Sequence, residues 1–443
     1  MLEFVSQTGA MGKMTCGSFA SRPQESSLWL FLFLEINMDG AVVVSKGKDP
    51  YHTARKALRA FPLPKMRGER ILIKPNAARL ARPGQGITTH PLVVKAIIDH
   101  LKEIGVKEMA IGESCIFGVD AQTAFRWTGM KEIAEKEGIE LIDLDQGDPV
   151  EIPISKGTVV KKIKVPAILK EFGSVISIPV MKTHMHTHVS LSIKNMKGLL
   201  WRREKARFHQ LQYDDTITQG DKELDIAISD MASVLLPRLA VIDGTVGMEG
   251  MGPAYGKMKK MGVIVVGDNA LSADAIAARL MGFDPESIPH LRLSARKGLG
   301  EIQVQKITVK PCDFLKWEIP FDPPPSKLSI PFPDVIVHDE GACSACLSTL
   351  LVFLQNYHSR LTDYRLGDRN IHVGIGKHLS ACPKGTILIG NCTTKMKEMG
   401  RFIQGCPPVA SDILEALVGK DDIERDGSLV HSSCVGEAVH DKK

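Results

Sequence analysis

The sequence predicts an α/β protein of two units, a large domain around a mostly parallel sheet and a smaller α/β module. Between residues 38 and 310, short apolar runs alternate with helical stretches, as in parallel strands joined by crossover helices. A second alternation, at 311–430, carries four cysteines in predicted turns. The 443 residues, 44% of them hydrophobic, suffice for two units with cores of their own.

The order of the elements supports this fold class. In the large domain, buried strands are expected at 41–45, 71–74, 108–112, 175–178, 239–242 and 262–266, and helices at 91–104 and 122–136. In the smaller module, strands are expected at 334–340 and 386–389, and helices at 347–357 and 411–418. Because ligands of parallel α/β sheets bind at the carboxyl ends of the strands, polar residues directly after strands are candidate site residues.

Polar residues do follow the strands of the large domain. The candidate substrate-binding residues are Lys74, Asn76, His90, Glu113, Ser114, Asp243 and Glu249. Lysine side chains in such a position attract carboxylate or phosphate groups. We therefore expect the large domain to bind an anionic small molecule.

The densest polar cluster lies at 182–197. Its candidate catalytic residues are Lys182, His184, His188, Lys194, Asn195 and Lys197. In an extended segment, a spacing of two would point His184, His186 and His188 to one face. They could then bind zinc or nickel, or transfer protons near neutral pH. A plain polar loop is the alternative interpretation.

Three other features of the large domain have ordinary structural interpretations. The glycines at 247–256 could cradle an anion or form a flexible loop, and they match neither a Walker loop nor a dinucleotide fingerprint. Asp268 and Asp274 are expected to cap helices. The basic run 201–207 is expected on the surface or in a lid, with His209 close enough to join the site.

Four cysteines occupy turns of the smaller module. Cys343 and Cys346 lie between a predicted strand and a predicted helix, Cys392 follows the next predicted strand, and Cys406 precedes two prolines. Backbone N–H groups and the positive end of a helix dipole stabilise thiolates in such loops. An iron–sulfur site is favoured over a structural zinc site, which usually has a second Cys-x-x-Cys pair, and over cysteines without metal. Cys382 is interpreted as a loop cysteine, or else as a fifth ligand.

Six motifs of the large domain carry a family resemblance. They are Lys74-Pro-Asn76, Thr89-His-Pro91, Glu113-Ser114, Lys182-Thr-His184, Ile193-Lys-Asn-Met-Lys-Gly198 and Glu249-Gly-Met-Gly-Pro253. In this order they resemble the domain-of-unknown-function family 362, over about 40–310. The resemblance implies an iron–sulfur protein, because members of that family are mainly known for carrying iron–sulfur modules. It also implies a distant similarity to nickel-dependent lactate racemases.

The cysteine motifs of the smaller module carry a second resemblance. Cys-x-x-Cys after a strand, Gly-x-Cys after another strand and Gly-Cys-Pro-Pro before a helix are similar to nickel–iron hydrogenase small subunits. The cluster-bearing subunit of respiratory complex I shares the last two elements. The resemblance implies a flavodoxin-like scaffold on which Cys343, Cys346, Cys392 and Cys406 hold a 4Fe-4S cluster. The stretch between Cys346 and Cys392 is shorter than in the hydrogenase subunits, so part of their sheet should be absent.

These features predict a 4Fe-4S protein linked to redox chemistry or electron transfer, with a redox protein as partner. A non-redox enzyme, racemase- or lyase-like, that uses Lys182, His184 and His188 and has a structural cluster would also fit the sequence. So would a zinc-stabilised binding protein, and so would an assembly or docking protein.

Charge and the chain termini limit the choice of partners. A net charge of +5, from 56 basic and 51 acidic residues, and only 5% aromatic residues give no indication of nucleic-acid binding. The apolar run at 26–34 is too short to cross a membrane, so no membrane partner is expected. Residues 1–37 are expected to be a poorly ordered extension, 431–443 a flexible tail, and the compartment the cytoplasm.

Overall fold

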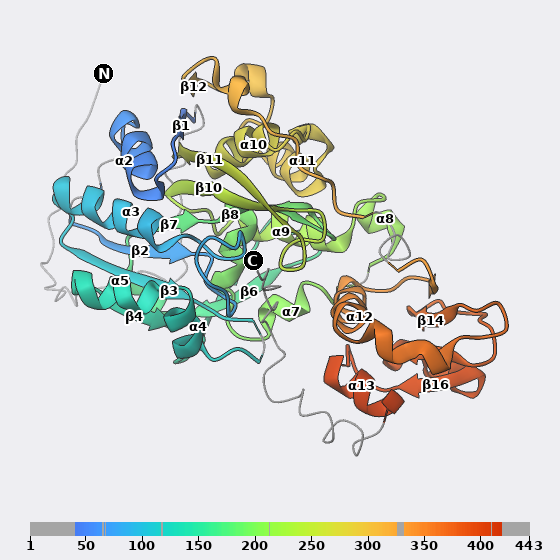
Figure 1. The fold of residues 1–443 in the computed structure, drawn as a ribbon. Helices are drawn as coiled ribbons and strands as arrows, with labels where there is room; N and C mark the ends of the chain where they lie inside the picture. The colour runs from blue at the N-terminus through green and yellow to red at the C-terminus, as the bar shows by residue number, and fades with distance from the viewer. Residues whose placement is uncertain are drawn as a thin grey trace, which may run out of the picture.

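The computed structural model describes residues 40–63, 66, 68–116, 118–211, 213–325, 332–408 and 410–418. The smaller module, drawn in orange and red, lies beside the large domain (Figure 1). The predicted extension at 1–37 and the predicted tail at 431–443 lie outside the described residues. The core of the large domain includes Phe314 and Phe321, so this domain extends beyond the predicted boundary at 310.

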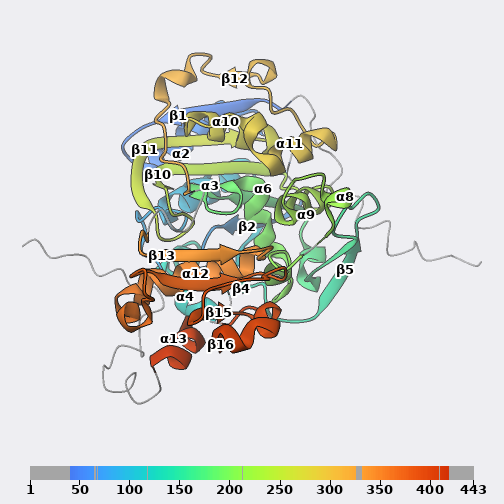
Figure 2. The same cartoon turned by 90° about the vertical axis from the view of Figure 1, so that its right-hand side faces the viewer.

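In the described residues, the large sheet has ten strands. Its main path runs β12 (Val309–Lys310), β1 (Val42–Lys46), β11 (Lys257–Gly267), β10 (Leu239–Glu249), β7 (Ser174–Ile178), β2 (Arg70–Pro75), β3 (Glu108–Glu113) and β4 (Glu140–Asp143). Strands β10, β7, β2, β3 and β4 are parallel, whereas β11 runs antiparallel to both β10 and β1. Figure 2 shows β1, β11 and β10 side by side. The prediction of a mostly parallel sheet is therefore confirmed.

A hairpin extends the sheet next to β10. It consists of β8 (Val180–His184), which pairs parallel with β10, and β9 (His188–Ser190), which pairs antiparallel with β8. Shorter elements of the large domain are β5 (Pro149–Pro153), β6 (Lys162–Pro166), α6 (Ser192–Asn195), the 3-10 helix η2 (Met196–Leu199), α7 (Glu204–Arg207) and α8 (Asp215–Thr218). The hairpin, α6 and η2 together carry the predicted cluster at 182–197.

Helices cover both faces of the large sheet. Ile71 and Ile73 of β2 pack in one core with α2 (Pro50–Ala60), α3 (Pro91–Glu103), α4 (Ala121–Trp127) and α5 (Met130–Glu137). Leu72 belongs to the core of the opposite face, with α9 (Glu223–Ala232), α10 (Ala270–Leu280) and α11 (Pro289–Arg296). Burial on both faces explains the continuous apolar runs of these strands.

The helix predicted at 122–136 is two helices. Gly129, between α4 and α5, has a φ of 75°, a left-handed conformation that an L-residue rarely adopts and that ends the first helix. Among the residues that the structure describes, none of the helices combines the length and the apolar character needed to cross a bilayer.

The smaller module has a four-stranded parallel sheet. Its strands β13 (Val335–Asp339), β14 (Ile371–Ile375), β15 (Thr386–Ile389) and β16 (Gly400–Ile403) lie in chain order. Helices α12 (Ser344–Tyr357) and α13 (Ala410–Val418) pack on this sheet through Leu350, Phe353 and Ile413. The predicted strands and helices of the module are present, and β14 and β16 are additional.

Candidate functional site

A buried ion pair joins the ends of two central strands. Lys74 is the second-last residue of β2, and its Nζ lies 2.7 Å from Oε1 of Glu113, the last residue of β3. Both side chains are 1% exposed. The backbone N–H groups of Ala77 and Ser114 also donate to the Glu113 carboxylate, each over 2.9 Å. The lysine charge is thus matched inside the protein, and burial still lowers the pKa of Lys74 against the opposing effect of Glu113.

Two asparagines connect this ion pair to Lys182. Lys74 Nζ donates to Asn195 Oδ1 over 3.3 Å, and Asn76 Nδ2 donates to the same oxygen over 3.4 Å. Lys182 Nζ in turn donates to Asn76 Oδ1 and to the carbonyl oxygen of Ile87, each over 2.7 Å. Five of the predicted site residues therefore belong to one hydrogen-bond network: Lys74, Asn76, Glu113, Lys182 and Asn195.

Helix α6 is held in place from outside by Asp274. This side chain is fully buried in α10, and its two oxygens accept hydrogen bonds from the backbone N–H groups of Ser192 (2.7 Å) and Ile193 (2.9 Å). Burial raises the pKa of Asp274 to about 7. The sequence suggested that Asp274 caps its own helix, but it lies inside α10 and caps α6 instead.

The turn after α6 lies directly against the buried ion pair. A Cβ atom at Gly198 would come within 2.6 Å of both Lys74 Nζ and Glu113 Oε1, so only glycine allows this approach. Asp274 at one end and Gly198 at the other fix the segment that carries Lys194, Asn195 and Lys197. This close packing explains why the Ile-Lys-Asn-x-Lys-Gly motif ends in glycine.

Further cations surround Lys182, and we call Arg79, Lys182, Lys194 and Lys197 the lysine cluster. Burial lowers the pKa of Lys182 well below its usual value, with the charges of Arg79 and Lys194 acting in the same direction. Burial lowers the pKa of Lys194 to about 7, although Asp225 opposes the shift. Within the described ranges, Arg79, Lys194 and Lys197 form no ion pair with a carboxylate. Sequence reasoning missed Arg79, although it follows Asn76 closely.

The other predicted substrate-binding residues hold loops. The Asp243 carboxylate accepts from the backbone N–H of His90 over 2.8 Å, and the His90 ring caps α3 by accepting from the Leu92 N–H. Glu249 pairs with Lys259 at 2.7 Å. Ser114 donates through Oγ to Asp145 over 2.7 Å. Of these residues, Ser114 joins the network of Lys74 and Asn195, through its backbone N–H and Glu113.

The three histidines of the predicted cluster do not lie along one extended strand. They lie in the β8–β9 hairpin, in which His184 pairs with His188 across the turn. His188 has a φ of 62° and its electrostatic neighbours are Asp225 and His290. The rings of His184 and His186 lie 5.7 Å apart, and His186 lies 6.1 Å from the ring of His209. The expected extended segment is a hairpin, and its tip brings His186 to His209 instead of to His188.

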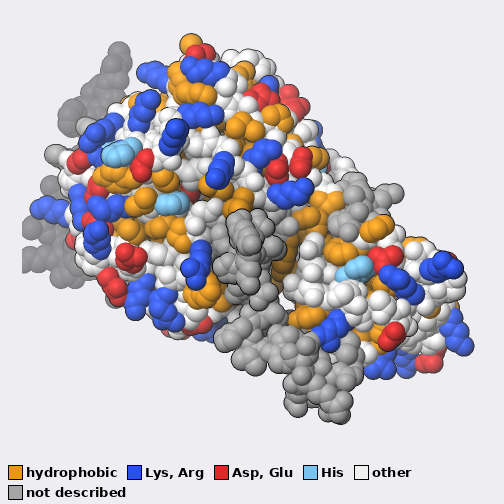
Figure 3. Space-filling view, in the orientation of Figure 1, with side chains coloured by type: hydrophobic (Ala, Val, Ile, Leu, Met, Phe, Trp, Pro, Cys, Tyr) orange, Lys and Arg blue, Asp and Glu red, His pale blue; other side chains and the backbone are white. Residues whose placement is uncertain are grey.

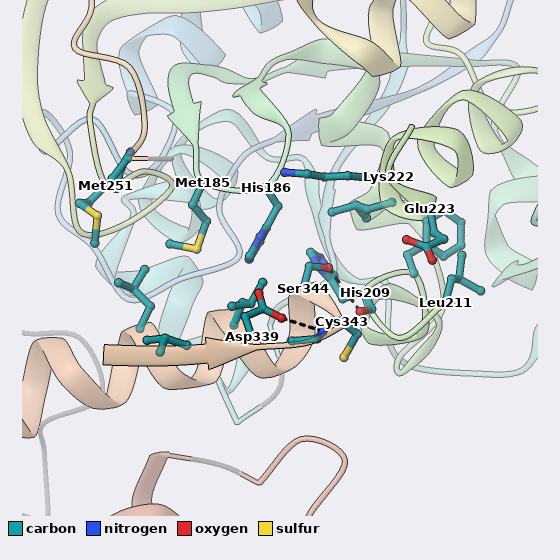
Figure 4. Close-up of a pocket in the computed structure, with 17 residues that line it drawn as sticks. Met185, His186, His209, Leu211, Lys222, Glu223, Met251, Asp339, Cys343 and Ser344 are labelled. Atoms are coloured by element: carbon teal, nitrogen blue, oxygen red, sulfur yellow. Dashed lines mark hydrogen bonds between the residues drawn. The ribbon is translucent and has the colours of Figure 1, made fainter. Parts of the chain in front are cut away.

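A cavity of about 550 Å³ lies between the hairpin and the smaller module. Figure 4 shows His186 and His209 on the side of the large domain, with Cys343, Ser344 and Asp339 on the side of the module. We call it the interface cavity. Its apolar walls are formed by Met185, Phe208, Leu211, Leu224, Met251, Val337, Leu347 and Leu351.

Hydrogen bonds next to the interface cavity dock the module. His186 Nε2 lies 2.7 Å from Ser348 Oγ, and His209 Nδ1 lies 3.0 Å from Ser344 Oγ. Gln210 Nε2 donates to the carbonyl oxygen of Cys406 over 2.8 Å. His209, expected near the site from its sequence position, is therefore a residue of the interface.

The four predicted cysteine ligands follow three strands of one parallel sheet. Cys343 and Cys346 come after β13 at the start of α12, Cys392 after β15, and Cys406 after β16. The carboxyl ends of parallel strands share one edge, so the four thiols gather there. Gly390 allows this packing, because its φ is 92° and a Cβ there would lie 3.3 Å from Cys346 Sγ. All four are free thiols.

The thiols influence each other electrostatically. The Cys346 thiol and backbone N–H groups at the start of α12 donate to Cys343 and lower its pKa to about 6. The pKa of Cys346 is raised by this hydrogen bond, by burial and by the negative potential of Cys343, Cys392 and Cys406. Over the described residues, no three histidine, cysteine, aspartate or glutamate side chains converge closely enough to hold a single metal ion.

Charged side chains on the surface are mixed in sign. On the face drawn in Figure 3, lysine and arginine side chains are spread over both units, with acidic side chains among them. The lysine cluster differs from this surface because its basic side chains lie together, Lys182 is only 3% exposed, and none of the four has a carboxylate partner in the described parts of the chain.

Comparisons with known proteins agree with one of the two resemblances. Residues 71–279 match the family described as Domain of unknown function (DUF362). The match lies within the predicted 40–310 and contains every candidate site residue of the large domain. The chain is also 25% identical over 232 residues to a thylakoid-associated protein of Synechocystis sp.. That alignment covers 52% of this chain and 69% of the relative.

Proposed function

We propose that this chain is a 4Fe-4S protein linked to redox chemistry or electron transfer, and that its large domain binds an anionic small molecule. The observation that carries this proposal is the interface cavity, which is lined by His186 and His209 of the large domain and by Cys343 of the quartet. The charge of Lys194 acts on His184, His186 and His209, and His186 and His209 line the same cavity as Cys343. A ligand at the lysine cluster would therefore lie on the side of the large domain that faces the cysteines.

The cysteine donors fit a cluster better than a single zinc ion. Zinc would require four sulfurs within about 2.3 Å of one point. In a 4Fe-4S cluster each thiolate binds a different iron, so the sulfurs stand further apart. The four thiols gather at one sheet edge, and the Cys346 thiol and backbone N–H groups at the start of α12 lower the pKa of Cys343, which favours thiolate ligands for a cluster. Cys343, Cys346, Cys392 and Cys406 would hold the cluster.

The strand order of the module supports the proposed flavodoxin-like scaffold. A flavodoxin-like sheet has the order 2-1-3-4-5. Without its second strand, the order becomes 1-3-4-5, in which all strands follow the chain. The order β13, β14, β15, β16 agrees with this shortened sheet, as does the short stretch between Cys346 and Cys392.

When bound, the cluster would supply single-electron transfer. The chain's own residues have other tasks: Arg79, Lys182, Lys194 and Lys197 attract and orient the anion, and His186 and His209 fix the module through Ser348 and Ser344. We also propose a redox protein as partner, because an electron carrier must exchange electrons with another protein. The free thiols of the described residues suit the proposed cytoplasmic compartment.

A second candidate function, a racemase- or lyase-like enzyme with a structural cluster, is favoured by one observation. A lysine whose pKa is about 7, as for Lys194, can accept a proton at neutral pH and act as a general base. In that enzyme, a cluster variant that still folds would keep its turnover, whereas Lys194→Gln would lose it.

Anaerobic purification tests the proposed function. Iron and acid-labile sulfide should be present, with a visible chromophore and an electron paramagnetic resonance signal after reduction. Cys406→Ser should lose most of this signal and iron, whereas Cys312→Ser, an exposed thiol outside the quartet, should keep them. A wild-type protein with zinc in place of iron, or equal iron in both variants, would contradict the proposed 4Fe-4S site.

A further inference from the structure

Only some of the lysines around Asn76 and Asn195 have a carboxylate partner. Lys74 has Glu113, and Lys205 has Asp145, whose Oδ2 lies 3.0 Å from the lysine Nζ. Lys182 Nζ, by contrast, donates to an amide oxygen and a backbone carbonyl, both neutral. Buried and half-buried cations are unfavourable without a negative partner.

Three more basic side chains near Lys182 also lack a carboxylate partner in the described residues. Arg79, Lys194 and Lys197 form no ion pair with any carboxylate of the described residues, and Lys197 instead lies 5.8 Å from the centre of the Phe208 ring. Together with Lys182, the lysine cluster holds four cations without a carboxylate partner in the described parts of the chain. A single monovalent anion would leave most of this charge unmatched.

The cations are held close to one another by the network described above. Asn76 accepts from Lys182, and Asn195, which donates to the carbonyl oxygen of Lys74 over 3.2 Å, directly follows Lys194 in α6. The Asp274 cap fixes α6, so Lys194 and Lys197 do not depend on a ligand for their position. The cluster is therefore preorganised for a negatively charged partner.

One side of the cluster is open. Lys74 and Lys182 are buried, whereas the side chains of Asn76, Arg79, Lys194 and Lys197 are partly exposed. A ligand can approach from that side and reach Lys182 last. The planar guanidinium of Arg79 can bind two oxygens of one carboxylate or phosphate group, and the lysines can bind the remaining oxygens.

We propose that the ligand of the lysine cluster carries at least two negative charges at neutral pH, as a phosphate ester or a dicarboxylate does. This inference rests on the proposed anion binding by the large domain and names the class of the anion.

Calorimetric titration of the full-length protein at neutral pH and constant ionic strength tests the inference. The probes are phosphate and sulfate for a phosphate ester, malonate for a dicarboxylate, and acetate for a monovalent anion. At least one dianion should bind about tenfold or more tightly than acetate, since each added charge-assisted contact is worth roughly that factor. Preference for phosphate and sulfate over malonate, or the reverse, distinguishes the two ligand types.

Variants test whether the anions bind at the lysine cluster. Lys194→Gln and Arg79→Gln remove partly exposed cations without a carboxylate partner in the described residues, so they should fold, and each should weaken dianion binding about tenfold. Lys131→Gln, which removes a partly exposed lysine of α5 that pairs with Glu135 outside the cluster, is the control and should leave binding unchanged.

Two outcomes distinguish the inferred charge of the ligand from the proposed anion site itself. If acetate binds as tightly as every dianion and binding depends on Lys194, the inference of a multivalent ligand is wrong and anion binding stands. If none of the four anions binds, or if Lys194→Gln and Lys131→Gln behave alike, both the inference and the proposed anion site are wrong.

Discussion

The lysine cluster and the cysteine quartet are built in different ways. Lys74 and Lys182, at 1% and 3% exposure, lie inside a ten-stranded domain and are fixed by side-chain partners such as Glu113 and Asn76. Cys392 and Cys406 are exposed at the edge of a four-stranded sheet. Their placement depends on backbone features, among them the left-handed Gly390. Substitutions should therefore cost folding stability at the first site and metal content at the second.

The largest effect is expected from Glu113→Ala. It leaves the Lys74 ammonium buried without its carboxylate, which should lower the free energy of unfolding by about 3–5 kcal/mol. Urea denaturation measures this change. Cys392→Ser, at the exposed site, should change the unfolding of the large domain by less than about 0.5 kcal/mol. If both variants lost the same free energy of unfolding, the proposed difference between the lysine cluster and the cysteine quartet would be wrong.

A smaller loss is expected from Asp274→Ala. Two backbone N–H groups of α6 lose their acceptor, which should cost about 1–3 kcal/mol of stability and weaken sulfate binding at the lysine cluster. Asp274→Asn keeps one acceptor oxygen, so it should retain part of the stability and part of the sulfate affinity that Asp274→Ala loses. Sulfate affinity that is the same in Asp274→Ala and in the wild type would show that α6 does not need this cap for binding.

The pH dependence of sulfate binding sharpens the description of the lysine cluster. Sulfate keeps its charge over the range tested, and Lys194 is protonated below its pKa of about 7. A bound anion raises that pKa, so the contribution of Lys194 to the affinity should be constant well below pH 7 and fall above it, by up to about tenfold per pH unit. Lys182 and Lys197, whose pKa values burial also lowers, add to the same trend. The slope should become shallower in Lys194→Gln, and an affinity that rises with pH would contradict this assignment.

The smallest effect concerns the contact between the two regions. Gln210→Ala removes one exposed hydrogen bond to the carbonyl of Cys406 and should lower the local opening free energy there by about 0.5–1 kcal/mol. Hydrogen exchange of the Cys406 loop and the first turn of α12 would report it as faster exchange. Gln122→Ala, an exposed substitution in α4, should leave this exchange unchanged.

The sequence was most informative where local pattern determines structure. Strands β2, β3 and β15 were predicted from apolar runs, and the rule that sites lie at strand ends led to Lys74, Asn76 and Glu113. Their mutual contacts follow because neighbouring parallel strands end at one edge.

Features that depend on distant parts of the chain were not predictable. The cap of α6 by Asp274 joins residues 82 positions apart, and no local pattern indicates it. The alternating histidines suggested an extended strand, but the chain reverses between His184 and His188. The position of His209 against Ser344 results from the docking of two units with separate cores.

Helix α12 limits how freely the two units can be recombined. Cys343 and Cys346, three residues apart, belong to the quartet, while Ser344 and Ser348, four residues apart, contact His209 and His186. A cysteine module transplanted from another protein would need hydroxyl groups at these two positions as well as the cysteines. Without them, it would meet two histidine rings that have lost their hydrogen-bond partners, so the large domain itself selects which modules it can carry.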